Sequence, residues 1–541
     1  MKKVYFLFDT EYCISKFAEA ELRKIFSGDG RFSFDSGCEI ENFLWDGKYD
    51  AVIILGTQSK LSKHQQKIID YVKSGGSIIF LNSSLENVKD KAISELTGCQ
   101  VKENMPVQQF TVFVEDKNHY ITQRFPQEFQ LTDLLYSVKT IDADIVFSTF
   151  NRGEKNPVVT AKEFGKGRVS CIFAGVTEQS WRQFNFRKIV IRSVAWTLKE
   201  KQKEKIIQCG LIGYGPMFGM GKGHATWINS TTGMKTIAVC DTNPERVQAA
   251  KQELPDLAGY FTDVEEMLKM EEIDLVVGIV PHNVHFDVVM KGLEYGKHVI
   301  IEKPFCINVE EASKMIETAK KKNLMLSVFH NRRWDGDYVV IRDIVESGLI
   351  GDIFHIECFI GSYSHPRYWW RSDKKISGGV MHDWGAHFID WILNLVPSKI
   401  TSIYGDFQKR VWFSVSNEDH GQALIRFEND VTADFMISSI AAISKPKWKI
   451  LGTKGAIEVN WETPDRVNLV RFISGVKHEG FVKIAQSYGC TEYYRNIADH
   501  LLVGEELIVK PEQSRRVIGV IEAAEKSSKI GKSVEPFENC E

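Results

Sequence analysis

The chain has 541 residues, of which 43% are hydrophobic and 26% charged, and its formal net charge is −3 at pH 7. This length exceeds what one hydrophobic core serves, so we expect two to four domains. The nearly balanced charge argues against nucleic acid or an anionic membrane as the main partner. The first apolar run, residues 4–8, is followed at once by Asp9 and Glu11, which predicts a strand and not a signal peptide. No run reaches the length of a membrane span.

Ten cysteines are scattered along the chain without a CxxC pair. The spacing indicates neither a zinc site nor a disulfide framework, so we expect no bound metal. Free thiols suit a reducing compartment, which predicts a cytoplasmic protein.

The first 200 residues predict an α/β domain. Strands are expected at 3–8, 51–55 and 77–81, and helices at 63–74 and 186–198, the first of them ended by Gly75 and Gly76. The next segment, 199–205, reads KEKQKEK and has no apolar anchor. It predicts a linker between two independent α/β units.

A dinucleotide-binding pattern opens the second unit. An apolar run from residue 206 enters a glycine turn at Gly213 and Gly215, and a second predicted strand, 236–241, ends in Asp241, which suits the ribose hydroxyls. In the motif G-x-G-x-x-G, the third glycine allows the helix to pack closely on the strand. In this sequence Phe218 occupies the third glycine position, and Gly219 follows one residue later. The alternative is a glycine turn in a domain that binds no nucleotide.

Further segments at 273–281, 284–295 and 298–301 continue the alternation of strand and helix. They predict a doubly wound parallel sheet with ligand at the carboxyl ends of its strands. Lys303 follows the last strand, beside Glu302, with which it could pair, and Pro304, which could hold a cis bond. The alternative for Lys303 is a solvated surface residue.

Asp383 and His387 form a second polar group. They lie four residues apart on a predicted helix and so share one face, with Asp390 three residues further on. The helix is otherwise apolar, and polar groups on such a helix need partners. The pair Gly378 and Gly379 before it allows close backbone approach. A functional site explains this pattern better than a helix surface pair.

Several spaced motifs resemble one enzyme family. They are the glycine turn, 281–285 (PHNVH), 302–304 (EKP), 331–333 (NRR), 378–387 and 450–458. In this order they resemble the glucose-fructose oxidoreductase/inositol dehydrogenase (Gfo/Idh/MocA) family, from about Lys205 to the C-terminus. The resemblance implies a Rossmann domain, 205–330, then an α/β domain, 331–541, on a large open antiparallel sheet that serves substrate binding and oligomer contacts. Strands predicted at 353–359, 422–427, 431–437 and 447–451 agree.

The resemblance also implies NAD as cofactor and a set of site residues. Catalytic roles fall on Lys303, Asp383 and His387. Cofactor contacts fall on Gly213, Gly215, Pro216, Met217, Phe218, Asp241, Pro281, His282, His285, Glu302 and Lys303. Substrate contacts are predicted at Arg332, within the matching motif 331–333, and at Tyr363, Trp370 and Arg371, which belong to an aromatic run, 363–371, that suits a sugar and equally suits a core. Asp241 favours NAD over NADP because its charge repels a 2′-phosphate, although Arg246 is close in sequence.

The chemistry follows from what these groups do. Oxidation of a secondary alcohol sends a hydride to the nicotinamide and the hydroxyl proton to a base. His387 suits the base, because imidazole titrates near neutral pH. Lys303 suits a donor that stabilises the developing alkoxide, and Asp383 could hold substrate hydroxyls or orient the imidazole. The resemblance does not settle which group takes the proton.

The first 200 residues resemble a different family. The segments 49–55, 72–76, 114–119 and 163–169 are similar to the trehalose-utilisation (ThuA-like) family, whose fold is like that of class I glutamine amidotransferases. The strand ending at Leu81 runs into Asn82 without a nucleophilic cysteine, which excludes glutamine hydrolysis. Polar candidates for a second site are Glu11, Cys13, Asp116, His119 and Asp133, although we expect Cys13 to be structural.

Together these features predict a sugar or polyol oxidoreductase that uses NAD and forms homo-oligomers. The fused ThuA-like domain would act on the keto-sugar or support its production. The alternatives are glycoside cleavage assisted by transient oxidation, which regenerates NAD, and a cofactor-binding regulator without turnover.

Overall fold

The computed structural model describes residues 1–10, 14–27, 30–38, 43–56, 58–85, 91–201, 205–484 and 489–536. It divides into two compact units. Unit 1 is Met1–Glu204 with Asp499–Glu506, and unit 2 is Lys205–Ala498 with Leu507–Glu541. The segment 499–506 therefore groups with the N-terminal residues, which the contiguous 331–541 domain of the sequence analysis does not anticipate. Glu11 and Cys13 lie outside the described residues.

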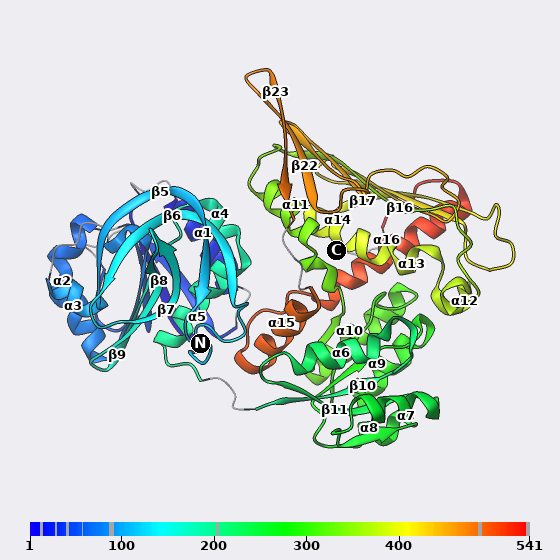
Figure 1. Cartoon of the computed structure of the whole chain (residues 1–541), viewed down its shortest axis with the longest axis horizontal. Coiled ribbons are helices and arrows are strands. Elements are labelled where there is room, and N and C mark those ends of the chain that lie inside the picture. Colours follow the sequence, from blue (N-terminus) through cyan, green and yellow to red (C-terminus); the bar gives the residue numbers. More distant parts are fainter. Residues whose placement is uncertain are drawn as a thin grey trace. The chain divides into compact units, whose positions relative to one another are not determined.

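Unit 1 contains a nine-stranded sheet, counting the described strands (Figure 1). Its parallel half runs in the order β2 (Phe32–Gly37), β1 (Lys2–Phe8), β3 (Ala51–Leu55), β4 (Ser77–Leu81) and β9 (Gly167–Ile172). The sheet continues antiparallel through β8 (Glu154–Phe164), β7 (Asp144–Asn151), β5 (Cys99–Val114) and β6 (Glu128–Thr140).

Helices cover both faces of the parallel half, so its central strands are continuously apolar. Val4 and Phe6 of β1 pack in the hydrophobic cluster of α1 (Ser15–Ser27) and α5 (Phe184–Thr197), whereas Leu7 packs in the cluster of α2 (Gln58–Ser74) and α3 (Lys91–Thr97). The short helices of this unit are η1 (Asn82–Leu85) and α4 (Glu178–Arg182). The three strands and two helices predicted here are therefore present, with α2 longer than expected.

Unit 1 also buries an ionic cluster. Arg192 binds Glu505 at 2.6 Å and Asp499 at 2.7 Å, and Lys188 binds Asp499 at 2.7 Å. Arg124 also contacts Asp499, so three cations meet two carboxylates in a place where the cationic side chains are at most 4% exposed. The cluster attaches the end of α15 (Gly489–Val503) to the N-terminal fold, which explains why 499–506 belongs to unit 1.

Unit 2 begins with a six-stranded parallel sheet, again counting the described residues. Its order is β12 (Gly259–Phe261), β11 (Met234–Cys240), β10 (Ile207–Ile212), β13 (Leu275–Gly278), β14 (His298–Ile301) and β15 (Leu326–Val328). The order reverses between β10 and β13, which is where a doubly wound sheet binds its ligand. The surrounding helices are η2 (Met217–Gly219), α6 (Met220–Asn229), α7 (Pro244–Glu253), α8 (Val264–Leu268), η3 (His282–Val284), α9 (His285–Glu294) and α10 (Val309–Lys322).

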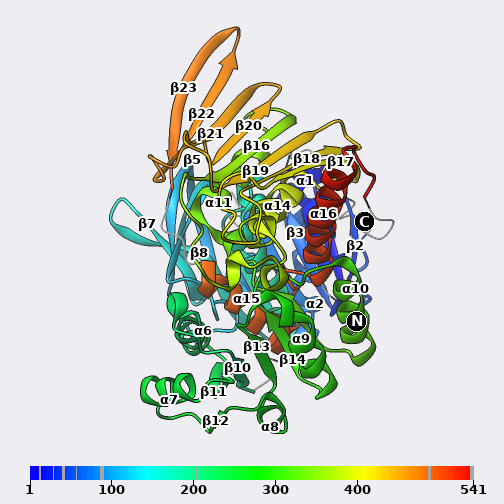
Figure 2. The same ribbon diagram turned by 90° about the vertical axis from the view of Figure 1, so that its right-hand side faces the viewer.

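The rest of unit 2 is built on an eight-stranded sheet (Figure 2). Its order is β17 (Ile400–Gln408), β18 (His420–Phe427), β19 (Thr432–Ser438), β16 (Ile353–Gly361), β20 (Trp448–Gly452), β21 (Gly455–Val459), β22 (Arg466–Ile473) and β23 (Val476–Lys483). All described neighbours are antiparallel except β16 and β19, which are parallel. The predicted antiparallel sheet is thus confirmed with one parallel pair.

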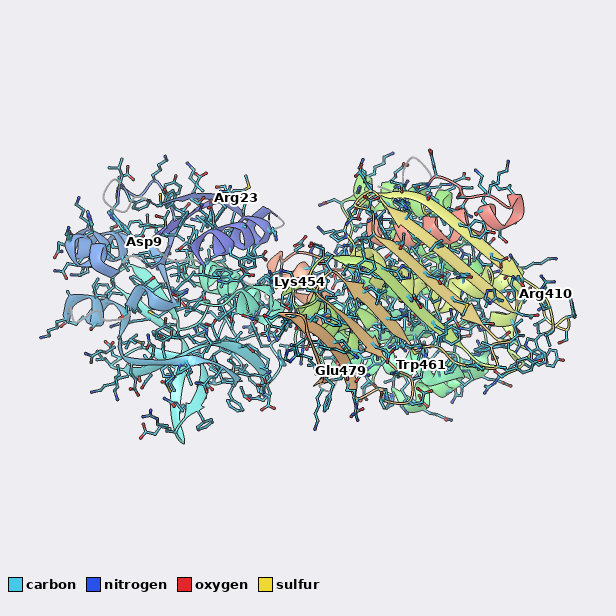
Figure 3. The ribbon with its side chains drawn as sticks, turned by 90° about the horizontal axis from the view of Figure 1, so that it is seen from above. Asp9, Arg23, Arg410, Lys454, Trp461 and Glu479 are labelled. Carbon is cyan, nitrogen blue, oxygen red and sulfur yellow. The ribbon has the colours of Figure 1, made fainter. Side chains whose placement is uncertain are left out.

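Helices cover only one face of this sheet. The core residues of α11 (Gly336–Glu346), α14 (Gly385–Leu395) and α16 (Pro511–Ile530) form one hydrophobic cluster with alternate residues of the strands. The opposite face is open (Figure 3) and carries Tyr404 and Leu424, directly opposite each other on β17 and β18 and 46% and 41% exposed. The short helices here are η4 (Asn331–Trp334), η5 (Trp370–Ser372), α12 (Lys374–Ser377) and α13 (Val380–Asp383). Within the described ranges, every helix is too short or too polar to span a bilayer.

Candidate active site

The turn after β10 shows why glycine stands at its first position. Gly213 has φ of +101°, and a Cβ there would lie 2.1 Å from the carbonyl oxygen of Ile279. Phe218, in the third place of the pattern, adopts the left-handed conformation (φ 59°), and Gly219 (φ 59°) leads directly into α6. The departure from G-x-G-x-x-G therefore places two left-handed residues directly before α6, at the helix N-terminus where a pyrophosphate is normally held. Pro216 begins this turn, and the side chain of Met217 lies outside the described set.

Asp241 lies at the carboxyl end of β11 beside the glycine turn. One carboxylate oxygen accepts the N–H of Tyr214 at 2.7 Å, and the other accepts the N–H of Asn243 at 2.9 Å. The guanidinium of Arg246 is 3.6 Å from the second oxygen. Asp241 thus shapes the turn itself, and its contact with a ribose stays a prediction.

Lys303 and Asp383 form the centre of the site. Lys303 follows β14, and its Nζ donates to Asp383 Oδ1 at 2.6 Å and to the Asp383 carbonyl at 3.1 Å. Arg371 lies 3.6 Å from the same carboxylate oxygen. Burial by itself raises the pKa of Asp383, but the charges of Lys303 and Arg371 outweigh it and lower the pKa to about 2. Asp383 is therefore ionised and holds Lys303 in place.

This geometry corrects two interpretations made from the sequence. Lys303 pairs with Asp383 and not with its neighbour Glu302, whose carboxylate binds His224 at 3.0 Å. Asp383 faces cations, so its described contacts do not orient the imidazole of His387. The Lys303–Pro304 bond is cis, as the sequence suggested.

His387 lies on α14, one turn beyond Asp383, with Trp384 between α13 and α14. It is 4% exposed, and its Nδ1 has no hydrogen-bond partner among the described residues. Burial, and then the charge of Lys303, hold the pKa of His387 well below 6.5. The imidazole is therefore neutral across the neutral pH range, and it does not titrate near pH 7 as the sequence analysis expected. A neutral imidazole beside an ammonium group is able to accept a proton.

His330 is a site residue that the sequence analysis missed. It follows β15, is 1% exposed, and its ring centre lies 6.0 Å from that of His387. Neither ring nitrogen is hydrogen-bonded within the part of the chain that the structure describes. Burial lowers the pKa of His330 to about 4. The sequence does not identify His330 as a site residue, because it is a lone histidine after an apolar strand. Its contact with His387 joins residues that are 57 positions apart.

The predicted substrate residues divide into two groups. Arg371 stacks over Trp370 at 4.4 Å, Trp369 at 5.1 Å and Phe218 at 5.4 Å, which places this group next to Asp383 and the glycine turn. Tyr363, which is 57% exposed, instead packs near Trp412 at 5.8 Å. Arg332 lies over Trp384 at 4.8 Å and binds Asp335 at 2.8 Å, and its charge acts on the pKa of His387. The described contacts thus join Arg332, Trp370 and Arg371 to the site, but not Tyr363.

Pro281 and His282 lie between β13 and α9, and His285 is the first residue of α9. The Nδ1 of His282 lies 2.8 Å from the carbonyl of Ser377, and its ring is 4.8 Å from Trp370. Both ring nitrogens of His285 lie within 3.0 Å of backbone carbonyls. His285 is fully buried, so its contacts fit a structural role at this loop better than the cofactor contact expected for it.

The second site expected in unit 1 is not assembled by its described candidates. Asp133 is fully buried and accepts three backbone N–H groups at 2.6–3.2 Å; burial raises its pKa to about 6. Asp116 accepts the N–H of Asn118 at 2.8 Å, and His119 packs on Trp196 at 5.3 Å. These contacts of Asp116 and Asp133 are to backbone N–H groups, and that of His119 is to an aromatic ring.

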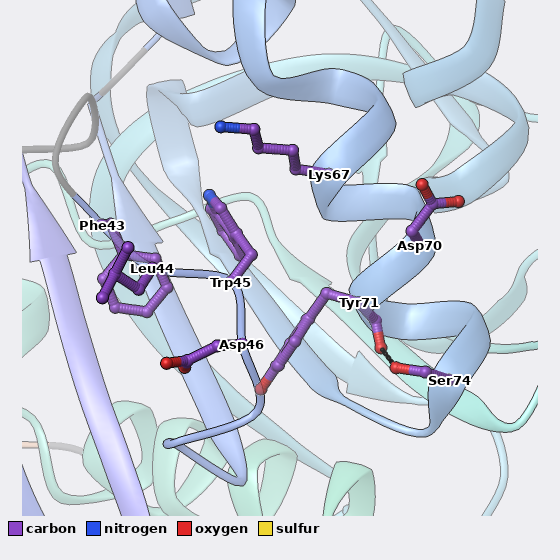
Figure 4. Close-up of a pocket in the computed structure, with 8 residues that line it drawn as sticks. All are labelled: Phe43, Leu44, Trp45, Asp46, Lys67, Asp70, Tyr71 and Ser74. Carbon is purple, nitrogen blue, oxygen red and sulfur yellow. Dashed lines mark hydrogen bonds between the residues drawn. The ribbon is translucent and has the colours of Figure 1, made fainter.

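A hollow of about 450 Å³ does open on unit 1, between the segment 43–46 and the second half of α2 (Figure 4). Aromatic and charged side chains line it together, and Trp45 packs edge-on against both Phe43 (4.8 Å) and Tyr71 (5.6 Å). The lining residues are Phe43, Leu44, Trp45, Asp46, Lys67, Asp70, Tyr71 and Ser74.

Three family models match the chain. A model described as an oxidoreductase family with an NAD-binding Rossmann fold (GFO_IDH_MocA) matches residues 207–330. A model of the GFO/IDH/MocA C-terminal domain matches residues 338–458. A model described as trehalose utilisation (ThuA) matches residues 15–197.

Individual relatives match part of the chain. The scyllo-inositol 2-dehydrogenase (NADP(+)) of Bacillus subtilis is 28% identical over 62% of this chain and 98% of that protein. An uncharacterized oxidoreductase of Schizosaccharomyces pombe is 36% identical, over 28% of this chain and 42% of its own length. Among solved structures, an NAD-binding protein from Listeria innocua has a TM-score of 0.55 at 28% identity, over 62% of this chain and 98% of that one.

Proposed function

Because the chain joins a ThuA-like domain to an oxidoreductase of the Gfo/Idh/MocA family, we propose that it interconverts a secondary alcohol and a ketone on a sugar, glycoside or polyol. The observation that carries this proposal is the Lys303–Asp383 pair, with Nζ and Oδ1 2.6 Å apart, at the carboxyl edge of the NAD-binding sheet beside a buried, neutral His387. The similarity to an enzyme named for scyllo-inositol supports a polyhydroxylated substrate.

Each side chain has a distinct part in this reaction. NAD, when bound, supplies the hydride acceptor. His387 takes the proton from the substrate hydroxyl, because its imidazole is neutral and its Nδ1 is unsatisfied within the described protein. Lys303 donates to the oxygen as it becomes an alkoxide, and Asp383 holds that ammonium group in position. Arg332 and Arg371 add positive charge around the developing oxyanion.

The test is a panel of monosaccharides, disaccharides and polyols, scyllo-inositol included, incubated with NAD and analysed by mass spectrometry and NMR. Formation of a ketone with an equal amount of NADH supports the proposal. Cleavage of a glycosidic bond without net NADH would instead establish redox-assisted glycoside cleavage. Binding of NAD without any turnover across the panel would establish a regulator.

We expect tighter binding of NADH than of NADPH, by about tenfold or more. The Asp241 carboxylate repels a 2′-phosphate, and tenfold corresponds to about 1.4 kcal/mol. Arg246, 3.6 Å from Asp241, works in the opposite direction. The preference is measured by fluorescence titration of both cofactors at fixed ionic strength, and the Asp241→Asn variant should reduce it. Equal or tighter binding of NADPH by the unaltered chain contradicts the expectation.

We also propose that the chain forms homo-oligomers through the open face of the eight-stranded sheet. The support is the pair of large apolar side chains, Tyr404 and Leu424, exposed opposite each other on a face without helices. Light scattering should give a multiple of the 61.7 kDa chain mass, and Leu424→Arg should lower it. The matched control is Phe150→Arg, which alters a residue of similar exposure on β7 of unit 1. An unaltered mass in the Leu424 variant removes this interface.

For the ThuA-like domain we propose a role in binding the keto-sugar. The support is the hollow in Figure 4, where aromatic faces and charged groups line one space, as sugars require. Joining the two sites in one chain raises the effective concentration of a dilute ketone. Trp45→Ala should leave ketone formation intact and change how much ketone accumulates. If the product profile of this variant matches that of the unaltered chain, the hollow has no part in the reaction.

A further inference from the structure

Hydrogen bonds connect three side chains, two of them buried, to the backbone of Lys303. The carboxylate of Glu302 at the end of β14 is 3.0 Å from Nε2 of His224 on α6, and Nδ1 of His224 is 2.6 Å from the hydroxyl of Tyr494 on α15. His224 and Tyr494 are both fully buried. The second oxygen of Glu302 accepts the backbone N–H of Lys303 at 3.1 Å. This series of hydrogen bonds therefore links α6, α15 and the end of β14, and it ends at the backbone N–H of the catalytic lysine.

The donors and acceptors of this series allow one arrangement when the imidazole is neutral. A carboxylate only accepts, so Nε2 of His224 donates to Glu302. The Nδ1 atom is then an acceptor, and the Tyr494 hydroxyl donates to it. Burial raises the pKa of Glu302, but the hydrogen bond from His224 and the charge of Lys303 outweigh burial and lower it below 4.5. Removal of the His224 donor should reverse that balance.

Other ionisable groups act on Glu302 from the surrounding elements. These groups carry no charge in the neutral pH range. Burial lowers the pKa values of the histidines, which are therefore neutral, and raises those of the thiol and the phenols, which therefore stay protonated. These groups are His285 on α9, His330 after β15, and Cys490, Tyr493 and Tyr494 on α15. Lys303 and His224 are therefore the groups that keep Glu302 ionised.

We propose that Tyr494 and His224 are positioning residues that keep Glu302 a carboxylate, and that this carboxylate fixes Lys303 for donation to the reacting oxygen. The inference rests on the proposed oxidoreductase function and extends its site to α6 and α15. Glu302 acts on Lys303 by accepting its backbone N–H. Protonation of Glu302 removes the charge and weakens the hold on the lysine.

The first test is the pH dependence of kcat. In His224→Phe the acid limb should move up by about one pH unit, because Glu302 loses its donor and takes up a proton at higher pH. The loss of turnover should approach tenfold only at acid pH, below the pKa of Glu302, and turnover at pH 9 should lie within about threefold of that of the unaltered chain. Tyr494→Phe should shift the acid limb in the same direction but by less. His224→Gln keeps an amide that donates a hydrogen bond, so its acid limb should lie between those of His224→Phe and the unaltered chain. His478→Phe, on the exposed strand β23, is the control and should not shift the limb.

The second test needs no substrate. In a chain labelled with ¹⁵N-histidine, the Nε2–H proton of His224 should give a low-field NMR signal that disappears in His224→Phe and moves upfield in Glu302→Gln. If no sugar is oxidised, this signal still decides whether the chain of hydrogen bonds exists. A pH profile of His224→Phe parallel to that of the unaltered chain, with only a lower Tm, would make His224 a merely structural residue and overturn the proposal.

Discussion

Replacement of Lys303 by methionine should lower kcat for alcohol oxidation by about a hundred- to a thousandfold while NADH affinity stays within about threefold. In the proposed reaction the ammonium group donates to the oxygen that becomes an alkoxide, and loss of one preorganised donor of this kind costs about two to three orders of magnitude. Methionine keeps the apolar stem but leaves Asp383 without its 2.6 Å partner. The proposed role of Lys303 requires no contact with the adenosine half of the cofactor, so binding should persist.

The control for this substitution is Lys297→Met. Lys297 immediately precedes β14, at the end opposite Lys303, and its Nζ binds the carbonyl of Met270 at 2.7 Å. Lys297 is 7% exposed and the side chain of Lys303 is 13% exposed, so the substitution tests whether loss of a largely buried lysine at the other end of β14 is enough to lower turnover. Turnover is measured by NADH absorbance, and affinity by quenching of tryptophan fluorescence. Near-native turnover in Lys303→Met, or an equal loss in Lys297→Met, removes the assigned role.

His387→Ala tests the other half of the chemistry. A neutral, buried imidazole is the proton acceptor in the proposed reaction, and a positioned base contributes about 10²- to 10⁴-fold. The variant should therefore lose turnover on that scale and keep its NADH affinity. If its turnover stays close to native, another group takes the proton.

Substitution of Asp499 by asparagine should lower the free energy of unfolding of unit 1 by about 3–5 kcal/mol, because it leaves buried cations without a counter-charge. Asp499 is 1% exposed and meets Arg124, Lys188 and Arg192. Burial raises its pKa, but these three cations outweigh burial and hold the pKa far below its usual range. The contribution of Asp499 to the free energy of unfolding is therefore fully present above about pH 4. It is lost only as the pH falls towards the pKa of Asp499 in the folded protein.

The measurement is hydrogen exchange of α5 peptides in increasing urea, since α5 carries Lys188 and Arg192. The matched control is Glu95→Ala, which removes an ion pair of unit 1 whose members, Lys91 and Glu95, are 91% and 63% exposed. An exposed pair contributes about 0–1 kcal/mol, so this control should change little. Equal effects of the two substitutions would show that the buried cluster does not hold 499–506 in unit 1.

Local patterns in the sequence were sufficient to predict most of the fold. The continuous apolar runs of β3, β4 and β14 predicted strands buried on both faces, and the structure buries all or nearly all of each. Gly213 could be identified from the sequence because the turn requires a residue without Cβ, whatever surrounds it. The choice of Lys303, Asp383 and His387 rested on the family resemblance and on polar residues in apolar surroundings, and both signals are local.

Tertiary packing decided which of these groups meet. The sequence allowed Lys303 to pair with its neighbour Glu302, but the pair forms with Asp383, 80 residues away, because the turn after β14 aims the two side chains at different elements. His330 and His224 entered the site only through contacts with helices distant in sequence. The attachment of 499–506 to unit 1 depends on three cations from positions 124, 188 and 192, more than 300 residues earlier. Spacing along a chain predicts which face of an element a side chain occupies, whereas its partner is set by how the elements pack.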